Sequence, residues 1–428
     1  MPATIAAVAL IATLDTKGVE AGFVRERLQA ANLAVRLYDV GCLGAPAIQP
    51  DVTSDQVFRS AGSSLAEQRR RAERGEAISA AARGITQWIQ ADYAAGKIAG
   101  VLALGGSAGT TIGTAAMRGL PIGVPKLMVS TLASGQTRPW VGDKDILVLN
   151  SIVDLAGINR ISRPILTNAA AAMAGMIAGG ASPPLPRSPG MAQFAANAAG
   201  GRPIIAATMF GVTTPGVQQA RQILEAHGYE VLVFHATGNG GQAMESLIDE
   251  GLFAGVLDLT TTELADEQLG GILSAGPDRL TAAGRRGIPQ VVSVGALDMV
   301  NFGPRATVPE RFRDRQFNQH NAAVTLMRTT PAENRHLGEE MGRKVAAASG
   351  RAAVLFPSRG VSALDRAGQP FDDPTARAEL LAGIRATLGT GELIEVDSHI
   401  NDRSFAEAAA DKLLELLRRA AAERTETR

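Results

Sequence analysis

The chain has 428 residues, which at about 100–200 residues per domain predicts two or three domains and excludes a peptide or a small adaptor. Apolar residues make up 46% of the chain, enough to bury large cores, and 42 Lys and Arg balance 42 Asp and Glu. The zero net charge and the 4% aromatic content argue against a dedicated DNA-binding protein and a stacking platform for single-stranded bases.

Apolar runs of strand length alternate with amphipathic runs of helix length along the whole chain, the pattern of βαβ units around a parallel sheet. The predicted strands are, in chain order, 4–13, 33–39, 99–104, 124–130, 145–150, 203–209, 230–236, 253–259, 288–295, 323–329, 352–357 and 392–397. Between the two sets, residues 179–190 read GGASPPLPRSPG, a composition typical of linkers. The sequence therefore predicts an α/β protein of two Rossmann-like domains with mainly parallel sheets: residues 1–180, a linker at 181–202, and residues 203–428.

Cysteine usage and the apolar runs indicate where the protein works. The single cysteine, Cys42, has no partner for an internal disulfide, so we expect a reducing compartment, the cytoplasm. The N-terminal apolar run 5–14 lacks a preceding basic segment and predicts a buried strand rather than a signal peptide. The small-residue run 169–181 is shorter than the ~20 residues of a membrane span, so we predict a packed helix end and no membrane partner.

Three segments recur in the same order on the two sides of the linker, which indicates an internal duplication, with two unrelated α/β domains of similar strand-loop-helix order as the alternative. The segment ALIATLDTKG from residue 9 parallels AATMFGVTTP from 206, IAGVLALGGSAG from 98 parallels FAGVLDLTTTEL from 253, and GVPKLMVSTLASG from 123 parallels GIPQVVSVGALDM from 287. The first copy has an insertion around residues 44–83. Its charged stretch EQRRRAERGE predicts a solvated helix with pairs such as Arg69 and Glu73.

A glycine-rich turn follows the strand predicted at 99–104 and leads into a helix. Glycines let backbone N–H groups approach an anion, and the start of a helix favours negative charge, so this turn predicts a phosphate site. The Walker pattern G-x-x-x-x-G-K-[ST] is absent, and a short connection without a ligand is the alternative. The candidate nucleotide-binding residues of this turn are Gly105, Gly106, Ser107, Ala108, Gly109 and Thr110.

Two further loops leave neighbouring strands of the first domain. After the first strand, Lys17 is a candidate for a phosphate, Asp15 for a metal ion or a ribose hydroxyl, and Thr16 for the helix cap. A capped helix with a solvated lysine is the alternative for this loop. The loop after strand 124–130 supplies the hydroxyl groups of Ser130, Thr131 and Ser134. Because carboxyl ends of parallel strands share one edge of a sheet, we expect the three loops to converge.

The second domain contains a possible dinucleotide fingerprint. The turn Gly238-Asn239-Gly240-Gly241-Gln242-Ala243 matches G-x-G-x-x-A, and Asp258 follows Gly238 by 20 positions, the spacing at which an acidic residue meets a ribose. The turn is not the first βα turn of its domain, and the chain has 47 glycines, so a chance match is the alternative.

Polar side chains at the ends of second-domain strands are candidates for general acid and base work or for metal ligands. The catalytic candidates are His235, Asp258, Glu263 and His320, with His399 as a further histidine near the same edge. Thr213, Thr214 and Thr261 also lie near this edge, and capping of loops and helices is the alternative for each residue. Close metal-ligand spacings such as H-E-x-x-H or C-x-x-C are absent from the sequence, so no metal ligand is assigned.

Over essentially its full length the chain resembles the tomato mosaic resistance protein-like ATP-binding family. The matching stretches are LDTKG, LGGSAGT, GVPKLMVSTLASG, SIVDLAGIN, TMFGVTTPGV, VFHATGNGG, GVLDLTTTEL, GILSAGP, GIPQVVSVGALDMVNFG, HNAAVTLMRTT and HIND. The resemblance implies two Rossmann-like subdomains, ATP on the first-domain loops, and self-association into a homo-oligomer. The family's usual second glycine of the turn is Ala108 here.

These observations together predict an ATP-binding protein in which magnesium bridges the phosphates. A small anionic metabolite is expected in the interdomain cleft. If the protein is an enzyme, phosphoryl transfer, nucleotidyl transfer or ATP-driven ligation is the reaction class we expect. One alternative is a non-catalytic, nucleotide-responsive regulatory or binding protein. The other is an NAD-dependent oxidoreductase that uses the Gly238 turn and Asp258.

Overall fold

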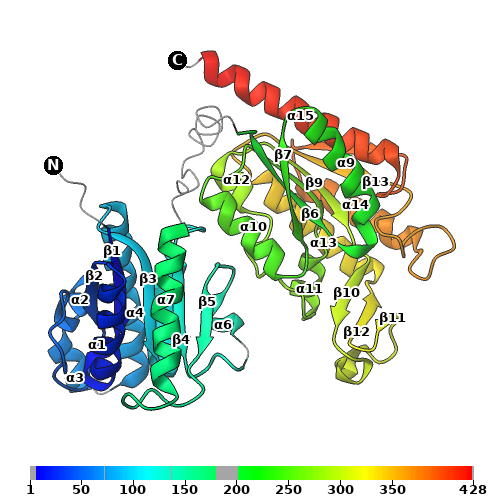
Figure 1. Cartoon of the computed structure of the whole chain (residues 1–428). Coiled ribbons are helices and arrows are strands. Elements are labelled where there is room, and N and C mark those ends of the chain that lie inside the picture. Colours follow the sequence, from blue (N-terminus) through cyan, green and yellow to red (C-terminus); the bar gives the residue numbers. More distant parts are fainter. Residues whose placement is uncertain (1–5, 72, 136, 180–200, 427–428) are drawn as a thin grey trace. The chain divides into compact units, whose positions relative to one another are not determined.

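The computed structural model describes residues 6–71, 73–135, 137–179 and 201–426 (Figure 1). The chain divides into two compact units, residues 1–185 and 186–428. Most of the predicted linker at 181–202 lies outside the described residues. Among those residues, no helix has both the length and the apolar character needed to cross a bilayer.

The first unit is built on a five-stranded parallel sheet in the order β2-β1-β3-β4-β5. Its strands are β1 (Ala7–Ala12), β2 (Val35–Asp39), β3 (Ile98–Gly105), β4 (Lys126–Ser130) and β5 (Leu147–Asn150). Its helices are α1 (Leu14–Ala30), α2 (Ser54–Ser60), α3 (Leu65–Arg71), α4 (Arg74–Ala94), α5 (Ser107–Arg118), α6 (Arg138–Val141) and α7 (Ser162–Gly179).

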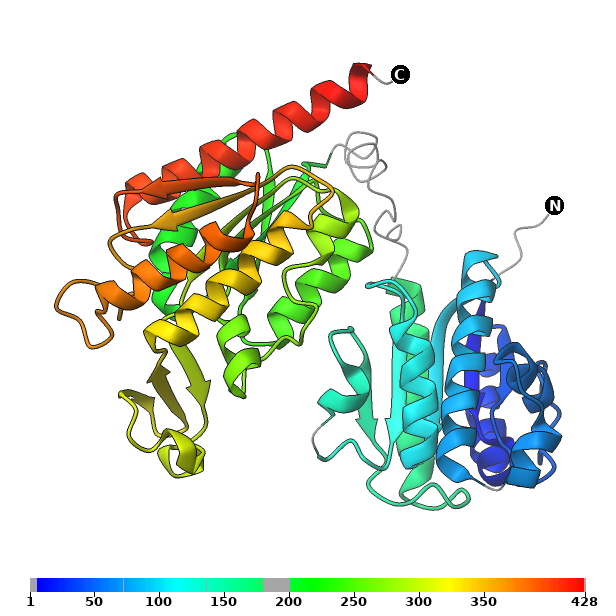
Figure 2. The same ribbon diagram turned by 180° about the vertical axis from the view of Figure 1, so that it is seen from behind.

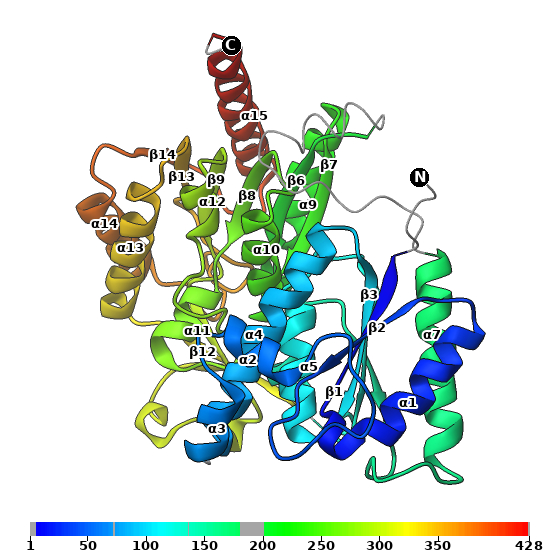
Figure 3. The same ribbon diagram turned by 90° about the vertical axis from the view of Figure 1, so that its left-hand side faces the viewer.

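Helices cover both faces of this sheet. Figure 3 shows α1 and α7 on one side of the strands and α4 and α5 on the other. In β1, Val8 and Leu10 belong to the core beneath α1 and α7, whereas Ala9 and Ile11 belong to the core beneath α2, α4 and α5. A strand that is buried on both faces has apolar residues at successive positions, which explains why these strands read as continuous apolar runs.

The second unit is built on a six-stranded parallel sheet in the order β14-β13-β9-β8-β6-β7. Its strands are β6 (Ile204–Met209), β7 (Glu230–His235), β8 (Gly255–Thr260), β9 (Gln290–Gly295), β13 (Ala352–Pro357) and β14 (Glu392–Val396). Its helices are α9 (Thr214–Ala226), α10 (Asn239–Asp249), α11 (Glu263–Leu269), α12 (Ala282–Arg286), α13 (Pro331–Ala346), α14 (Pro374–Thr387) and α15 (Arg403–Glu426). Figure 2 shows α15, in red, on one side of these strands and α13 and α14 on the other.

The two parallel sheets share one strand order. When the parallel strands of each unit are counted along the chain, both sheets have the order second, first, third, fourth, fifth. This order is β2-β1-β3-β4-β5 in the first sheet and β7-β6-β8-β9-β13 in the second. The matched sequence segments lie at β1 and β6, at β3 and β8, and at β4 and β9. This agreement supports the duplication. The predicted insertion at 44–83 is also confirmed, since it holds α2 and α3, whereas the second unit has α10 alone between β7 and β8.

Every predicted strand is present, but one of them belongs to a sheet that the sequence did not predict. β12 (Val324–Arg328) is the middle strand of an antiparallel sheet with β10 (Met299–Phe302) and β11 (Phe317–Asn321). β10 follows β9 almost directly, so its apolar residues look like a continuation of that strand. β11 reads FNQHN and lies at a sheet edge, where no apolar run marks it.

Close packing of α4 on α2 gives a testable consequence. A Cβ atom at Gly84 of α4 would lie 2.0 Å from the backbone oxygen of Val57, so we expect Gly84→Ala to lower the free energy of unfolding by about 1–3 kcal/mol. Gly175→Ala on α7 is the control, because nothing lies within 4 Å of the added methyl group and alanine favours a helix by up to about 1 kcal/mol. Urea unfolding followed by circular dichroism compares the two variants. Equal stability of Gly84→Ala and the natural protein would contradict this packing.

Candidate functional site

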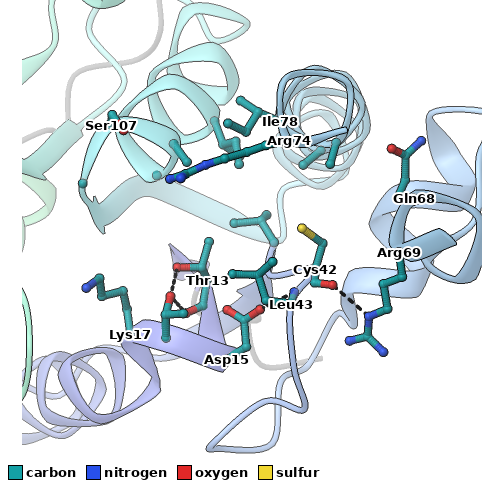
Figure 4. A pocket seen from close by; sticks show the side chains of 18 of the residues that line it. Thr13, Asp15, Lys17, Cys42, Leu43, Gln68, Arg69, Arg74, Ile78 and Ser107 are labelled. Atoms are coloured by element: carbon teal, nitrogen blue, oxygen red, sulfur yellow. Dashed lines mark hydrogen bonds between the residues drawn. The ribbon is translucent and has the colours of Figure 1, made fainter. Parts of the chain in front are cut away.

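The first unit has a cavity of about 650 Å³ at the carboxyl edge of its sheet (Figure 4). It lies where β1 has β2 on one side and β3 on the other, the switch point at which open α/β sheets bind ligands. Its volume lies in the range of small-molecule sites. The lining residues are Thr13, Asp15, Thr16, Lys17, Val40, Cys42, Leu43, Gln68, Arg69, Glu73, Arg74, Ala77, Ile78, Ala81, Gly106, Ser107, Ala108, Gly109 and Ile112.

The glycine-rich turn forms one wall of this cavity. A Cβ atom at Gly105 would lie 2.7 Å from the Cα atom of Gly109, so the turn folds back on the end of β3 too closely for a side chain. The backbone N–H of Thr110 donates to the carbonyl of Gly106 at 2.8 Å. The N–H groups of the three residues before Thr110 therefore have no acceptor within the helix. Residues 106–109, hereafter the α5 turn, thus place backbone N–H groups without a helix acceptor at the cavity wall, an arrangement that favours negative charge.

The start of α1 is capped differently from the prediction. The buried carboxylate of Asp39 accepts hydrogen bonds from the backbone N–H groups of Leu14, at 3.0 Å, and Gly41, at 2.9 Å. Burial raises the pKa of Asp39 above its usual value, and these backbone N–H groups oppose that shift. The hydroxyl of Thr16 pairs with that of Thr13 at 2.8 Å. Asp39, at the end of β2, therefore takes the role expected of Thr16.

Lys17 lies at the edge of the cavity. Its backbone dihedrals, φ −125° and ψ 19°, depart from helical values and mark a kink in α1. Its ammonium group donates to the backbone carbonyl of Leu155 and lies 4.0 Å from a carboxylate oxygen of Asp154. The SIVDLAGIN segment after β5 thus holds the lysine beside the cavity, and its side chain is 17% exposed.

Asp15 connects α1 to the loop that follows β2. Its Oδ2 atom accepts from the backbone N–H groups of Leu43, at 2.7 Å, and Gly44, at 3.1 Å. Its Oδ1 atom is buried and has no hydrogen-bond partner within the described structure. One carboxylate oxygen therefore has a structural role, and the other is buried without a partner in a residue that lines the cavity.

The inserted helices contribute cavity residues that the sequence analysis did not single out. The stretch predicted as one solvated helix is divided between α3 and α4, and Arg69 of α3 donates to the backbone carbonyls of Cys42, at 2.8 Å, and Gly44, at 2.7 Å. Figure 4 shows Arg74 extending from the start of α4 across the cavity toward the side that carries Ser107. The insertion at the switch point was the one signal in the sequence for these residues.

The cavity lining combines positive charge with an apolar wall. Lys17, Arg69 and Arg74 face two acidic residues, Asp15 and Glu73. The apolar part consists of Val40, Ala77, Ile78, Ala81 and Ile112. Cys42 is half-buried there, and burial, together with the nearby carboxylate of Asp15, raises the pKa of its thiol. Such a lining suits a ligand with one anionic end and one flat, apolar end.

The third predicted loop supports α5 rather than lining the cavity. The buried hydroxyls of Thr110 and Ser130 pair with each other at 2.7 Å, and the Ser130 hydroxyl also accepts from the backbone N–H of Leu132 at 2.9 Å. Thr131 lies next to Gly106, since a Cβ atom there would be 3.7 Å from its hydroxyl oxygen, and Ser134 is exposed. Two of the three loops therefore meet at the cavity, and the third lies behind the α5 turn.

The corresponding edge of the second unit is filled by a buried ion network. Arg279 is fully buried, and its guanidinium donates to both oxygens of Asp258, at 2.5 and 2.8 Å, to Glu263 at 2.6 Å, and to Glu245 at 3.2 Å. Although burial alone lowers the pKa of Arg279, these carboxylates raise it well above its usual value, so the side chain stays charged. Two predicted catalytic residues, Asp258 and Glu263, thus serve here as partners of a buried arginine.

The same network also uses the backbone N–H groups and the aspartate of the predicted dinucleotide fingerprint as hydrogen-bonding partners. The backbone N–H groups of Gly238 and Gly241 donate to Oε1 of Glu263, at 2.7 and 3.1 Å. Asp258 also accepts from the hydroxyl of Thr208 at 2.7 Å. A carboxylate of the protein itself therefore lies where the pattern would receive a pyrophosphate.

The other candidates of the second unit lie on separate elements. His235 is exposed at the end of β7, with its ring centroid 5.6 Å from that of Phe210, and His320 is exposed on β11. His399 is buried, its Nε2 atom is 2.7 Å from the carbonyl oxygen of Ser362, and burial lowers its pKa. The threonine hydroxyls are bonded within the unit: Thr213 to Thr260, Thr214 to the carbonyl of Phe210, and Thr261 to the carbonyl of Ser293. No group of three His, Cys, Asp or Glu side chains suited to a metal ion occurs in the described part of the chain.

The matched sequence segments explain why one unit has a cavity and the other an ion network. In the alignment of IAGVLALGGSAG with FAGVLDLTTTEL, Ala108 stands where the second unit has Glu263, and Ala103 stands where it has Asp258. Two methyl groups thus replace the two carboxylates that fill the second unit. The space beside the α5 turn therefore stays open.

Comparisons with known proteins match both units of the chain to domains of one protein family. The family described as "Uncharacterised protein family (UPF0261) N-terminal domain" matches residues 6–182, and the corresponding C-terminal domain matches residues 202–417. A UPF0261 protein of Clostridium tetani is 45% identical over 95% of this chain and 98% of its own length. The ToMV resistance protein Tm-1 of Solanum lycopersicum is 43% identical over 80% of this chain and 45% of its own. The solved UDP-N-acetylglucosamine 2-epimerase of Rickettsia bellii is 9% identical over 96% of each chain, with a TM-score of 0.23, too low to support an inference.

The ion network predicts that removing Arg279 destabilises the protein far more than removing an arginine from an exposed ion pair. We expect Arg279→Met to lower the free energy of unfolding of the second unit by about 3–5 kcal/mol, because it leaves buried carboxylates without a counter-charge. The control is Arg285→Met, whose exposed pair with Asp249, at 2.7 Å, contributes less than about 1 kcal/mol. Urea unfolding measures both variants, and a loss for Arg279→Met as small as that of the control would contradict the network's structural role.

Proposed function

The chain belongs to the uncharacterised protein family UPF0261, and we propose that its first unit binds the phosphate groups of a nucleotide, with ATP as the specific candidate. The observation that carries this proposal is the open α5 turn, whose free N–H groups face a cavity at the switch point of the sheet. The equivalent edge of the second unit already holds its own carboxylates, so the proposal concerns the first unit.

The charges around the α5 turn support an anionic ligand. Lys17 lines the cavity, with its ammonium group held by the carbonyl of Leu155, and Arg74 reaches across the cavity toward the α5 side. A phosphate beside the α5 turn would have backbone donors on one side and these two cations around it. The apolar wall formed by Val40, Ala77 and Ile78 suits the flat face of a base.

Magnesium enters this proposal through the nucleotide. A magnesium ion usually keeps several waters and binds by substrate phosphates with one or two carboxylates, so a dedicated protein cage is not required. Two carboxylates, Asp15 and Glu73, line the cavity. When bound, the ion would neutralise phosphate charge, and the protein's own contribution is the α5 turn and the surrounding cations.

The internal comparison of the two units supplies the sharpest test. Ala108→Glu introduces into the α5 turn the residue that fills the second unit, and we expect repulsion of phosphate to weaken ATP binding by about a hundredfold or more. Ala108→Gln has nearly the same volume without the charge, so we expect a clearly smaller loss. Isothermal titration calorimetry with ATP measures both variants.

Two results of this titration would overturn the proposal or its geometry. Absence of binding of ATP, ADP and inorganic triphosphate to the natural protein would overturn the proposed function. An equal loss for the glutamate and glutamine variants would show that the α5 turn does not contact phosphate.

The single cysteine provides an independent measurement of occupancy. Cys42 is the one thiol of the chain and lines the cavity, so it is the one thiol that iodoacetamide can label. We expect saturating ATP to slow labelling several-fold, because a ligand covers the half-buried thiol. Since the pKa of the thiol is raised, the rate is measured at about pH 9, where more thiolate is present. Unchanged labelling in the presence of bound ATP would place the nucleotide outside this cavity.

A further inference from the structure

We propose that the cavity of the first unit selects a ribonucleotide, with the free carboxylate oxygen of Asp15 accepting a hydrogen bond from a sugar hydroxyl. The inference rests on the proposed function and names the class of nucleotide that the site takes. Two unpartnered acceptors in one cavity carry it.

The first acceptor is Oδ1 of Asp15. The other oxygen of this carboxylate is held by the backbone N–H groups of Leu43 and Gly44, at 2.7 and 3.1 Å, which fixes the orientation of the group. Oδ1 is buried and has no partner in the described structure. A buried acceptor without a donor destabilises a fold, and such atoms are rare in native proteins. A bound ligand with a donor at this position accounts for the arrangement.

The second acceptor is the side-chain oxygen of Gln68. This residue is 5% exposed, its amide nitrogen donates to the hydroxyl of Ser63 at 2.9 Å, and its Oε1 atom is buried without a partner. Gln68 lines the same cavity as Asp15. Ionised phosphate oxygens are acceptors, so they cannot satisfy either atom. A ligand that satisfies them carries donors beyond its phosphates, as the hydroxyls of a sugar and the amino group of a base do.

The order of these groups along the cavity matches the order of parts in a nucleotide. Figure 4 shows Lys17 and Ser107 toward one end and Gln68 and Arg69 toward the other, with Asp15 between them. Phosphates beside the α5 turn would place a sugar next to Asp15 and a base toward Gln68. The apolar residues Val40 and Ile78 belong to the same lining and can cover the faces of a base.

The test measures the coupling between Asp15 and the sugar hydroxyls. Binding of ATP and of 2′,3′-dideoxy-ATP to the full-length chain is titrated for the natural protein and for Asp15→Asn, in excess EDTA and again with magnesium. The asparagine keeps one oxygen for Leu43 and Gly44 but presents an NH₂ group, which cannot accept, in place of Oδ1. We expect the natural protein to prefer ATP by roughly tenfold to a hundredfold, the range of a hydrogen bond to a charged group. We expect the variant to lose this preference.

A matched control separates the hydrogen bond from the change in charge. Glu73→Gln removes one negative charge from the same cavity lining, so it alters phosphate affinity without touching Oδ1. We expect this control to shift the affinities for both nucleotides equally and to keep the preference for ATP. The unfolding midpoint of each ligand-free variant, compared with that of the natural protein, reports whether the β2 loop is intact.

Each outcome decides between named alternatives. A preference for ATP that survives in Asp15→Asn overturns the inference. An effect of Asp15→Asn that is equal for both nucleotides and present only with magnesium assigns Asp15 to the metal ion and also overturns it. Failure of the natural protein to bind either nucleotide or inorganic triphosphate is the failure of the proposed function itself, and it is distinguishable because no preference is then measured.

Discussion

Which groups accept hydrogen bonds from the first N–H groups of a helix determines the structure at the carboxyl edge of each parallel sheet. Helices that begin at the carboxyl edge of a parallel sheet leave their first N–H groups unpaired, and the protein satisfies them with carboxylates from neighbouring elements. Asp39 serves α1, Glu263 serves the start of α10, and Glu245 accepts from three consecutive N–H groups at the start of α12. The start of α5 has no such carboxylate, and the cavity is the result.

Much of the fold could be predicted because the physical signal is local. Strands buried on both faces give continuous apolar runs, and the repeated segments indicated an internal duplication, which the shared strand order supports. The antiparallel strand β10 was missed because its apolar residues follow β9 almost directly, and β11 was missed because a polar edge strand has no apolar run. The α5 turn was recognisable since its glycines are required by the close approach of Gly105 and Gly109, a constraint within a few residues.

The side-chain partners could not be predicted in the same way. A carboxylate at the end of a strand gives the same sequence pattern whether it meets a ligand or a buried arginine, and Arg279, the partner of Asp258, lies 21 positions later in an unremarkable turn. Arg69 and Gln68 read as a solvated charged helix, because nothing in their spacing shows that α3 lies beside the end of β2. These assignments depend on contacts between distant segments, which periodicity does not report.

The contrast between Ala108 and Glu263 also bears on how long the protein survives in a cell. The second unit carries its anion covalently, so its folded state does not depend on any metabolite. Under the proposed function, the first unit gains stability only in proportion to the logarithm of nucleotide concentration over the dissociation constant. Starvation for the nucleotide would thus expose the N-terminal half to proteases while leaving the C-terminal half resistant. Under the same proposal, one methyl group in place of a carboxylate would make the turnover of the chain responsive to metabolic state.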